Sequence, residues 1–354
     1  MNPILHHVDL ITRSRKRGEI EAEVIEAIHR TLGAVRTELH KIFMPPGDVL
    51  VGLSAEIEGA GPDGVASHDD GFAWPDLTSS IENRPYLQSR FGHDEPGFDR
   101  LPDGVTRLVQ MVRNDRHEPL GFLVVTRMAP FSAAELDLVH GFAALLRNCL
   151  ALLDYSETDT LTRLLNRKTF DEYLMRILAN IPVQDDAVAG SPNLPQRRHA
   201  HPEERDHWLG VMDIDHFKSI NDRFGHLIGD EVLILLANLM RESFRVQDKL
   251  FRFGGEEFVA LLRPAAFSHA MATFERFRTR VGQFEFPQVG HVTVSIGFTR
   301  IRLGDTPSQI LDSADSALYW AKEHGRNQCH AYEDLVAAGK LQRHQLPVAE
   351  IELF

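Results

Sequence analysis

The sequence contains little cysteine, no long hydrophobic run and fewer basic than acidic residues. Its two cysteines, Cys149 and Cys329, lie far apart in a chain of 354 residues, which excludes a disulfide framework and argues against a zinc cluster. No uninterrupted apolar run is long enough to span a membrane, and the N-terminus lacks the basic-then-apolar order of a secretory signal. We therefore expect a cytoplasmic protein with buried free thiols.

The formal charge of −13 disfavours general binding to nucleic acids or anionic lipids. A nucleotide substrate would need cations placed locally. The length favours two domains, since globular domains average about 150 residues.

The N-terminal part, residues 1–130, has the pattern of a mixed α/β domain. Glu19 to Ile42 carries apolar residues at helical spacing. The further segments are an alternating strand at 49–53, a Gly-, Pro- and Asp-rich stretch at 59–100, and two strands at 105–112 and 120–126. This layout resembles a GAF-type sensor domain, although no motif identifies its ligand.

A connecting helix is predicted over residues 131–158. Ser132 and Glu135 have the spacing of a capping box that opens it. Leu138, Leu145 and Leu152 then recur every seven residues, with Phe142 and Cys149 between them. Two interpretations stay open, a coiled coil between two copies and a single helix packed on its own domain.

The second domain, residues 159–335, alternates strands and helices and so predicts an α/β layer fold. Predicted helices cover 168–180, 230–244, 267–281 and 307–323, and strands cover 209–212, the hairpin 249–262 and 291–301. The polar stretch from Pro182 to Arg205 is interpreted as an exposed insertion. Its His199 and His201, with His207 just beyond, could bind a metal, but a solvated loop is the better interpretation. Residues 336–354 form a tail.

Carboxylates occur where two of these strands meet solvent. Asp213-Ile214-Asp215 ends a buried strand, and two acids so close repel each other unless a cation lies between them. In the hairpin, Gly254-Gly255 precedes Glu256-Glu257, and the glycines let a ligand approach the backbone. Taken singly, each piece could be an ordinary turn or helix cap.

Together these pieces resemble the GGDEF family of diguanylate cyclases. The resemblance covers roughly half the chain, although Arg163 stands where the family often has glycine. The matching segments are Asp159–Arg167, Asp213–Asp222, Gly225-His226, Gly229-Asp230, Arg252–Phe258, Ser295–Gly297 and Ala314–Asn327. The resemblance implies a fold like the palm of nucleotidyl cyclases and polymerases.

The resemblance also implies roles for individual residues. Mg²⁺, or Mn²⁺ in its place, would be held by Asp213, the carbonyl of Ile214, Glu256 and Glu257. Glu256 would also accept the proton of the attacking hydroxyl, and Lys218 would stabilise charge on the phosphate. The residues expected to bind GTP are Phe217, Lys218, Asn221, Asp230, Lys322 and Arg326, with Asn221 and Asp230 on guanine and Lys322 and Arg326 on the phosphates.

Arg245 and Asp248 match the family's RxxD inhibitory site for the product, and Arg276 is a candidate second arginine. An ordinary ion pair at a helix end is the alternative.

The expected activity is condensation of two GTP molecules into cyclic di-GMP with release of two pyrophosphates. One site holds one GTP, so the resemblance implies a homodimer. The alternative is a silent domain that only binds GTP or cyclic di-GMP as a receptor. A phosphodiesterase finds no support, because no Glu-Ala-Leu signature or separate cluster of histidines and acids is present.

Overall fold

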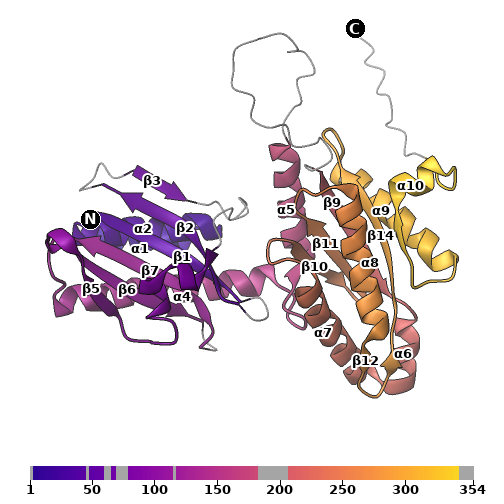
Figure 1. The fold of residues 1–354 in the computed structure, drawn as a ribbon, viewed down its shortest axis with the longest axis horizontal. Coiled ribbons are helices and arrows are strands. Elements are labelled where there is room, and N and C mark those ends of the chain that lie inside the picture. The colour runs from indigo at the N-terminus through magenta and orange to yellow at the C-terminus, as the bar shows by residue number, and fades with distance from the viewer. Residues whose placement is uncertain are drawn as a thin grey trace, which may run out of the picture. The chain divides into compact units, whose positions relative to one another are not determined.

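The computed structural model describes residues 3–44, 48–59, 65–68, 79–114, 117–181 and 206–342. The chain divides into two compact units, Met1–Ser156 and Glu157–Phe354, and Figure 1 labels most of their elements. His199 and His201, the whole of the predicted insertion from Pro182 to Arg205 and most of the tail lie outside the described residues.

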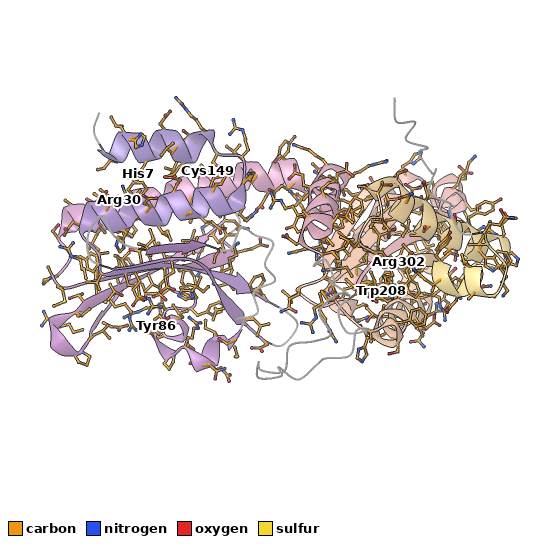
Figure 2. The ribbon with its side chains drawn as sticks, turned by 90° about the horizontal axis from the view of Figure 1, so that it is seen from above. His7, Arg30, Tyr86, Cys149, Trp208 and Arg302 are labelled. Carbon is orange, nitrogen blue, oxygen red and sulfur yellow. The ribbon has the colours of Figure 1, made fainter. Side chains whose placement is uncertain are left out.

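The N-terminal unit is built on a seven-stranded antiparallel sheet in the order β3-β2-β1-β7-β6-β5, with β4 paired to β2. The strands are β1 (Arg36–Phe43), β2 (Leu50–Glu58), β3 (Val65–His68), β4 (Ser79–Ser80), β5 (Gly97–Arg100), β6 (Thr106–Arg113) and β7 (Pro119–Arg127). The helices are α1 (Pro3–Arg13), α2 (Arg17–Leu32), α3 (Pro85–Gln88) and α4 (Ala133–Glu157), with 3-10 turns η2 (Ile81–Asn83) and η3 (Pro102–Gly104). Residues of α1, α2 and α4 share one core with one face of the sheet, and Figure 2 shows Tyr86 on the opposite face.

The predicted helix over 19–42 is wrong beyond Leu32. Gly33 adopts a left-handed conformation with φ of 57° and donates its N–H to the carbonyl of His29, which ends α2. Leu39 fits the helical spacing, but it enters the core from β1. An apolar period can therefore continue across a helix end into a strand, and the sequence pattern alone did not separate the two.

The connecting helix α4 begins with the predicted capping box. Ser132 N donates to Glu135 Oε2 at 2.8 Å, and Glu135 N donates to Ser132 Oγ at 3.4 Å. Leu152 of the predicted heptad is 72% exposed, whereas Leu138 and Leu145 lie at the core edge. The buried stripe of α4 consists of Val139, Phe142, Ala143, Leu146, Leu150 and Leu153. In this structure the helix packs on its own domain.

Among the described residues, α4 is the helix that is long and apolar enough to cross a membrane by length and composition. Its mean hydropathy over the best window is 1.5, and a third of that window is buried inside the unit. A core helix of a globular domain has the same properties, and the buried stripe of α4 gives it that role here.

The C-terminal unit has a six-stranded sheet in the order β15-β14-β9-β11-β10-β8. Its strands are β8 (Leu165–Asn166), β9 (His207–Ile214), β10 (Lys249–Gly254), β11 (Glu257–Leu262), β14 (Val294–Ile301) and β15 (Cys329–Ala331), and β12 (Glu285–Phe286) pairs with β13 (Gly290–His291). Its helices are α5 (Arg167–Asn180), α6 (Phe217–Phe224), α7 (His226–Ser243), α8 (Phe267–Gln283), α9 (Pro307–Glu323) and α10 (Tyr332–Ala337). Residues of α5 and α9 pack on one face of the sheet, and those of α6, α7 and α8 pack on the other.

This unit confirms the predicted α/β layers, including α5, β9, the hairpin β10–β11 and α9. The sequence did not predict α6, and α7 begins four residues before the expected start at Asp230. Gly225 separates the two helices with a φ of 83°, a conformation that suits glycine.

Both cysteines are free thiols, but they are only partly buried, contrary to prediction. Cys149 lies beside the buried stripe of α4, and Cys329 lies in β15 at the edge of its sheet.

Candidate active site

Three carboxylates gather where β9 meets the β10–β11 hairpin. Asp213, near the end of β9, lies directly opposite Glu257 of β11, so both side chains emerge on the same face of the sheet. Glu256 lies in the hairpin tip, after Gly254 and Gly255, whose φ values of 141° and 53° make the turn possible. Asp213 is buried, Glu256 is half-buried and Glu257 is exposed. The fold thus brings together the predicted metal ligands.

Among the described residues, one ammonium group is paired with these carboxylates. Lys322 Nζ at the end of α9 lies 2.8 Å from Asp213 Oδ1. Burial raises the pKa of Asp213 although Lys322 opposes the shift, and Glu257 adds to it. Burial and then the charge of Asp213 raise the pKa of Glu256. The site therefore carries more negative charge than its own cation balances.

The donors present fit Mg²⁺, because they are oxygens and excess negative charge surrounds them. Among the described residues, no three His, Cys, Asp or Glu side chains form a ready metal cage. Mg²⁺ usually binds to one or two carboxylates together with water and substrate phosphates, so a partial set is what this ion requires. The side chain of Ile214 lies in the core, which leaves only its carbonyl for the predicted role.

The carboxylate of Asp215 is engaged in hydrogen bonds within the fold, which the Asp213-Ile214-Asp215 motif did not indicate. Its carboxylate accepts hydrogen bonds from Ser295 Oγ at 2.7 Å, Thr293 Oγ1 at 2.6 Å and the backbone N–H of Asn327 at 3.0 Å. The bond to Asn327 fixes the turn after α9, where Arg326 and Asn327 have φ values of 61° and 45°. Asp215 is therefore a positioning residue for the turn that carries Arg326. Sequence reasoning assigned it no such role.

The predicted guanine-binding residues lie on α6 and α7. Asn221 packs against Gly229, where an added Cβ would lie 1.9 Å from Asn221 Oδ1. Gly229 thus lets Asn221 lie against α7 next to Asp230, which is exposed. Lys218 is exposed on the first turn of α6, while the side chain of Phe217 is buried in the core, so only its backbone is available to GTP.

The C-terminal unit is similar to known proteins. Residues 193–328 match the family described as diguanylate cyclase, GGDEF domain. The solved GGDEF domain of DgcB from Caulobacter crescentus, in complex with c-di-GMP, is 33% identical and spans 50% of this chain and 94% of that one, with a TM-score of 0.41. The C-terminal unit therefore contains a GGDEF domain.

Two curated relatives are named as cyclases. Diguanylate cyclase DgcP from Pseudomonas aeruginosa is 37% identical over 174 residues, which cover 48% of this chain and 23% of DgcP. Diguanylate cyclase A from Treponema denticola is 32% identical over 199 residues, which cover 54% of this chain and 49% of the relative. The chain thus spans less than half the length of these relatives.

The start of the GGDEF domain is tied to its signature hairpin by Arg252. Its guanidinium donates to Asp159 Oδ1 at 3.0 Å and to the carbonyl of Gly255 at 2.8 Å. Asp159 also accepts from the N–H of Thr162 at 2.8 Å, which closes the turn. Arg163 in that turn has a φ of 61°, which explains why glycine suits the position. No local sequence pattern predicts this link, because its partners are far apart along the chain.

The RxxD residues lie at the opposite end of β10 from the signature. Asp248 is buried, and its carboxylate accepts the backbone N–H groups of Arg245 at 3.0 Å and Arg263 at 3.2 Å. The contact of Arg245 with Asp248 therefore involves the backbone, not the guanidinium of an ordinary ion pair. Arg276 donates to the carbonyl of Ser243 at 2.7 Å, close to Arg245 along the chain.

Proposed function

We propose that this protein is a diguanylate cyclase that condenses two GTP molecules into cyclic di-GMP and two pyrophosphates, with Mg²⁺ or Mn²⁺ as its cofactor. The observation that carries the proposal is the grouping of Asp213, Glu256 and Glu257 around Lys322, beside a glycine-tipped hairpin of the GGDEF family. Curated relatives named diguanylate cyclase support the same activity.

The residues of the site suit phosphoryl transfer. Asp213, Glu256 and the carbonyl of Ile214 would hold the ion, with Glu257 assisting. When bound, a divalent cation neutralises charge on the phosphates. The raised pKa of Glu256, caused by burial and by the charge of Asp213, makes it a better acceptor for the proton of the 3′-hydroxyl. Lys218 would stabilise the charge that develops on the transferring phosphate.

GTP would lie between α6–α7 and the end of α9. Asp230 can accept the N–H groups on the edge of guanine, and Asn221 supplies the complementary amide. Adenine lacks this donor pattern. Lys322 and Arg326 would bind the terminal phosphates, and the hydrogen bond from Asn327 to Asp215 fixes the turn that carries Arg326.

Two copies of the chain are needed for the complete reaction. One site binds one GTP, whereas the product contains two new phosphodiester bonds. In a homodimer with antiparallel nucleotides, each 3′-hydroxyl attacks the α-phosphorus of the other GTP, and pyrophosphate leaves.

Incubation of the purified chain with GTP and Mg²⁺, followed by chromatography, tests the activity. We expect cyclic di-GMP and pyrophosphate, a loss of at least about 100-fold in Glu256→Ala, and an unchanged rate in the control Glu285→Ala, whose side chain is exposed in β12. A dimeric sample that binds GTP but forms neither product would instead establish the silent receptor.

The N-terminal unit is proposed to be a GAF-like sensor that acts in the cytoplasm, where GTP is found. Its packing against α4, the helix that leads to the GGDEF domain, supports a role in setting how two cyclase domains meet. Activity and its dependence on protein concentration should change when residues 1–150 are deleted, and unchanged values would disprove the role.

The RxxD turn is proposed to bind the product and inhibit the enzyme. Arg245 and Arg276 are exposed, and an arginine can bind a phosphate or a guanine edge through two hydrogen bonds. Asp248 is proposed to contribute to base recognition, although the structure already uses its oxygens for backbone N–H groups.

A further inference from the structure

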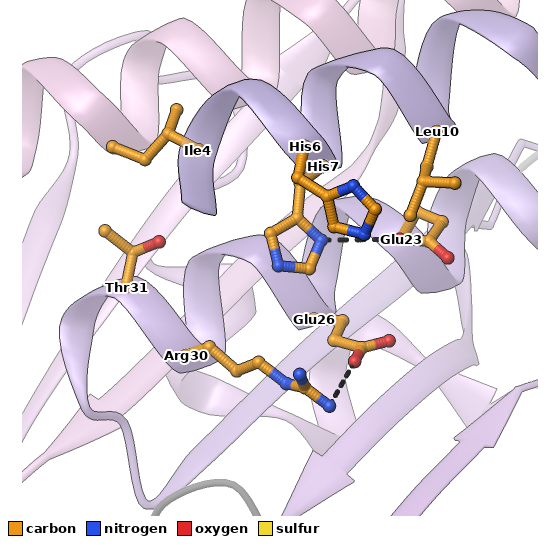
Figure 3. Close-up of a pocket in the computed structure, with 8 residues that line it drawn as sticks. All are labelled: Ile4, His6, His7, Leu10, Glu23, Glu26, Arg30 and Thr31. Carbon is orange, nitrogen blue, oxygen red and sulfur yellow. Dashed lines mark hydrogen bonds and ion pairs between the residues drawn. The ribbon is translucent and has the colours of Figure 1, made fainter. Parts of the chain in front are cut away.

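A hollow of about 510 Å³ lies between α1 and α2 of the N-terminal unit. Figure 3 shows the residues that line it, which are Ile4, His6, His7, Leu10, Glu23, Glu26, Arg30 and Thr31. Its volume falls in the range of about 300–1,000 Å³ that is typical of small-molecule sites. It is separate from the cyclase site, which lies in the other unit.

The lining of this hollow carries an excess of negative charge. Glu23 and Glu26 lie three residues apart on α2 and therefore share one face of the helix. Arg30 pairs with Glu26, with its guanidinium nitrogen 2.6 Å from Glu26 Oε1 (Figure 3). With neutral imidazoles, two carboxylates against one guanidinium leave one negative charge unbalanced. A cation would balance it.

Of these two carboxylates, Glu23 is the one without a permanently charged partner among the described residues. Its Oε2 atom lies 3.4 Å from Nδ1 of His7, whose side chain is 9% exposed, and its own side chain is 28% exposed. A partly buried carboxylate is stabilised by a nearby positive charge more than by a neutral imidazole. The strongest ligand contact in the hollow should therefore be a cation on Glu23.

The remaining lining groups favour an organic cation over a metal ion. In the part of the chain that the structure describes, no three His, Cys, Asp or Glu side chains are placed to hold a metal. The imidazole of His6 and the hydroxyl of Thr31 can accept hydrogen bonds from N–H donors. Ile4 and Leu10 supply apolar contact, which suits a short methylene chain.

We propose that this hollow binds a small organic amine, with the ammonium group on Glu23 and the alkyl chain against Ile4 and Leu10. Binding would hold α1 against α2. Ile11 of α1 is fully buried in the core that also contains the stripe of α4, and Arg17 of α2 forms an ion pair with Asp154 of α4. The amine would therefore act on the helices that pack against α4. This regulatory consequence rests on the proposed function, whereas the binding itself does not.

Calorimetric titration of the full chain with putrescine, without GTP, tests the site. We expect saturable binding that is at least tenfold weaker in Glu23→Gln and unchanged in Glu19→Gln, a matched change on the same helix outside the hollow. Thermal melting of each variant without ligand verifies folding. If Glu23→Gln unfolds, Glu26→Gln replaces it, because the Arg30 guanidinium freed from Glu26 would then balance the charge of Glu23 and weaken amine binding.

Absence of saturable putrescine binding, or equal affinity in Glu23→Gln, would overturn the proposal. Separate titrations with zinc chloride and inorganic phosphate identify the alternatives. Zinc binding that His7→Gln abolishes, without amine binding, would establish a metal site, and phosphate binding alone would establish an anion site. Because GTP is absent, none of these results depends on cyclase activity, and the cyclase assay does not depend on them.

Discussion

The two ends of β10 carry acidic turns that the fold uses differently. At the first end, Asp248 is buried, and its two carboxylate oxygens accept the N–H groups of Arg245 and Arg263. At the other end, the hairpin leads to Glu256, which is half-buried and accepts no hydrogen bond from the described residues. The first acid closes a turn, and the second remains available to a ligand.

The pKa alone does not distinguish these two acids. Burial is the largest cause of a raised pKa in both, and it is opposed by backbone N–H groups at Asp248 and increased by the charge of Asp213 at Glu256. The two positions differ in whether the carboxylate oxygens already have hydrogen-bond donors. A carboxylate that lacks them in a crowded acidic site is the better candidate for chemistry.

The largest effect on the rate is expected for Asp213→Asn, which removes the negative charge near the end of β9, beside the hairpin. Loss of this charge should lower the cyclase rate at least about 100-fold. Folding should not suffer, because the raised pKa of Asp213 means that its ionisation lowers stability as the pH rises from the unfolded-state pKa through the folded-state pKa, a loss that asparagine avoids. Pyrophosphate release measures the rate, and chemical denaturation at pH 7 measures stability. A large loss of stability would show that Asp213, like Asp248, is mainly structural.

For Asp248→Ala we expect the opposite result, which is a loss of stability with little change in the rate. Two backbone N–H groups lose their acceptor, and each buried group left unpaired costs about 1–3 kcal/mol. Removal of a buried carboxylate whose pKa is raised offsets part of this, so the free energy of unfolding should fall by about 1–3 kcal/mol. The rate per folded molecule should stay within about twofold of the unmodified chain, because the turn lies at the other end of β10 from Glu256. Unchanged stability with lost activity would contradict the comparison.

Sequence patterns predicted most of the C-terminal fold because its elements carry local signals. The helix α9 has both a capping box at Thr306 and Gln309 and a proline at its first position. In the N-terminal unit, the boundary between α2 and β1 was missed, because its signal is the single residue Gly33 within a continuous apolar period. The left-handed conformation of Gly33 ends the helix, although the apolar period continues beyond it.

The residue types of the candidate site were predictable from the sequence, but the role of each residue was not. Asp213 and Asp215 look equivalent in sequence, and only the hydrogen bonds of Asp215 to Ser295 and Asn327 show that it fixes a turn. The link between Arg252 and Asp159 joins residues 93 positions apart and depends on the pairing of β10 with β8. Such contacts follow from tertiary structure, which no local pattern encodes.

A smaller effect is expected for Arg245→Ala, which tests whether the RxxD turn binds the product in addition to stabilising the fold. The guanidinium of Arg245 is exposed and makes no hydrogen bond with the described residues, so stability should not change. If the turn binds product, loss of one charge-assisted hydrogen bond should weaken inhibition by cyclic di-GMP about tenfold. The measurement is the initial rate of pyrophosphate release over a range of added cyclic di-GMP. Arg241→Ala is unsuitable as a control, because Arg241 donates a hydrogen bond to the carbonyl of Thr162. Arg223→Ala, an exposed change on α6, is the better control. Inhibition that is equal in the unmodified chain, Arg245→Ala and Arg276→Ala would show that this end of β10 serves the fold alone, and the contrast with the signature end would then be complete.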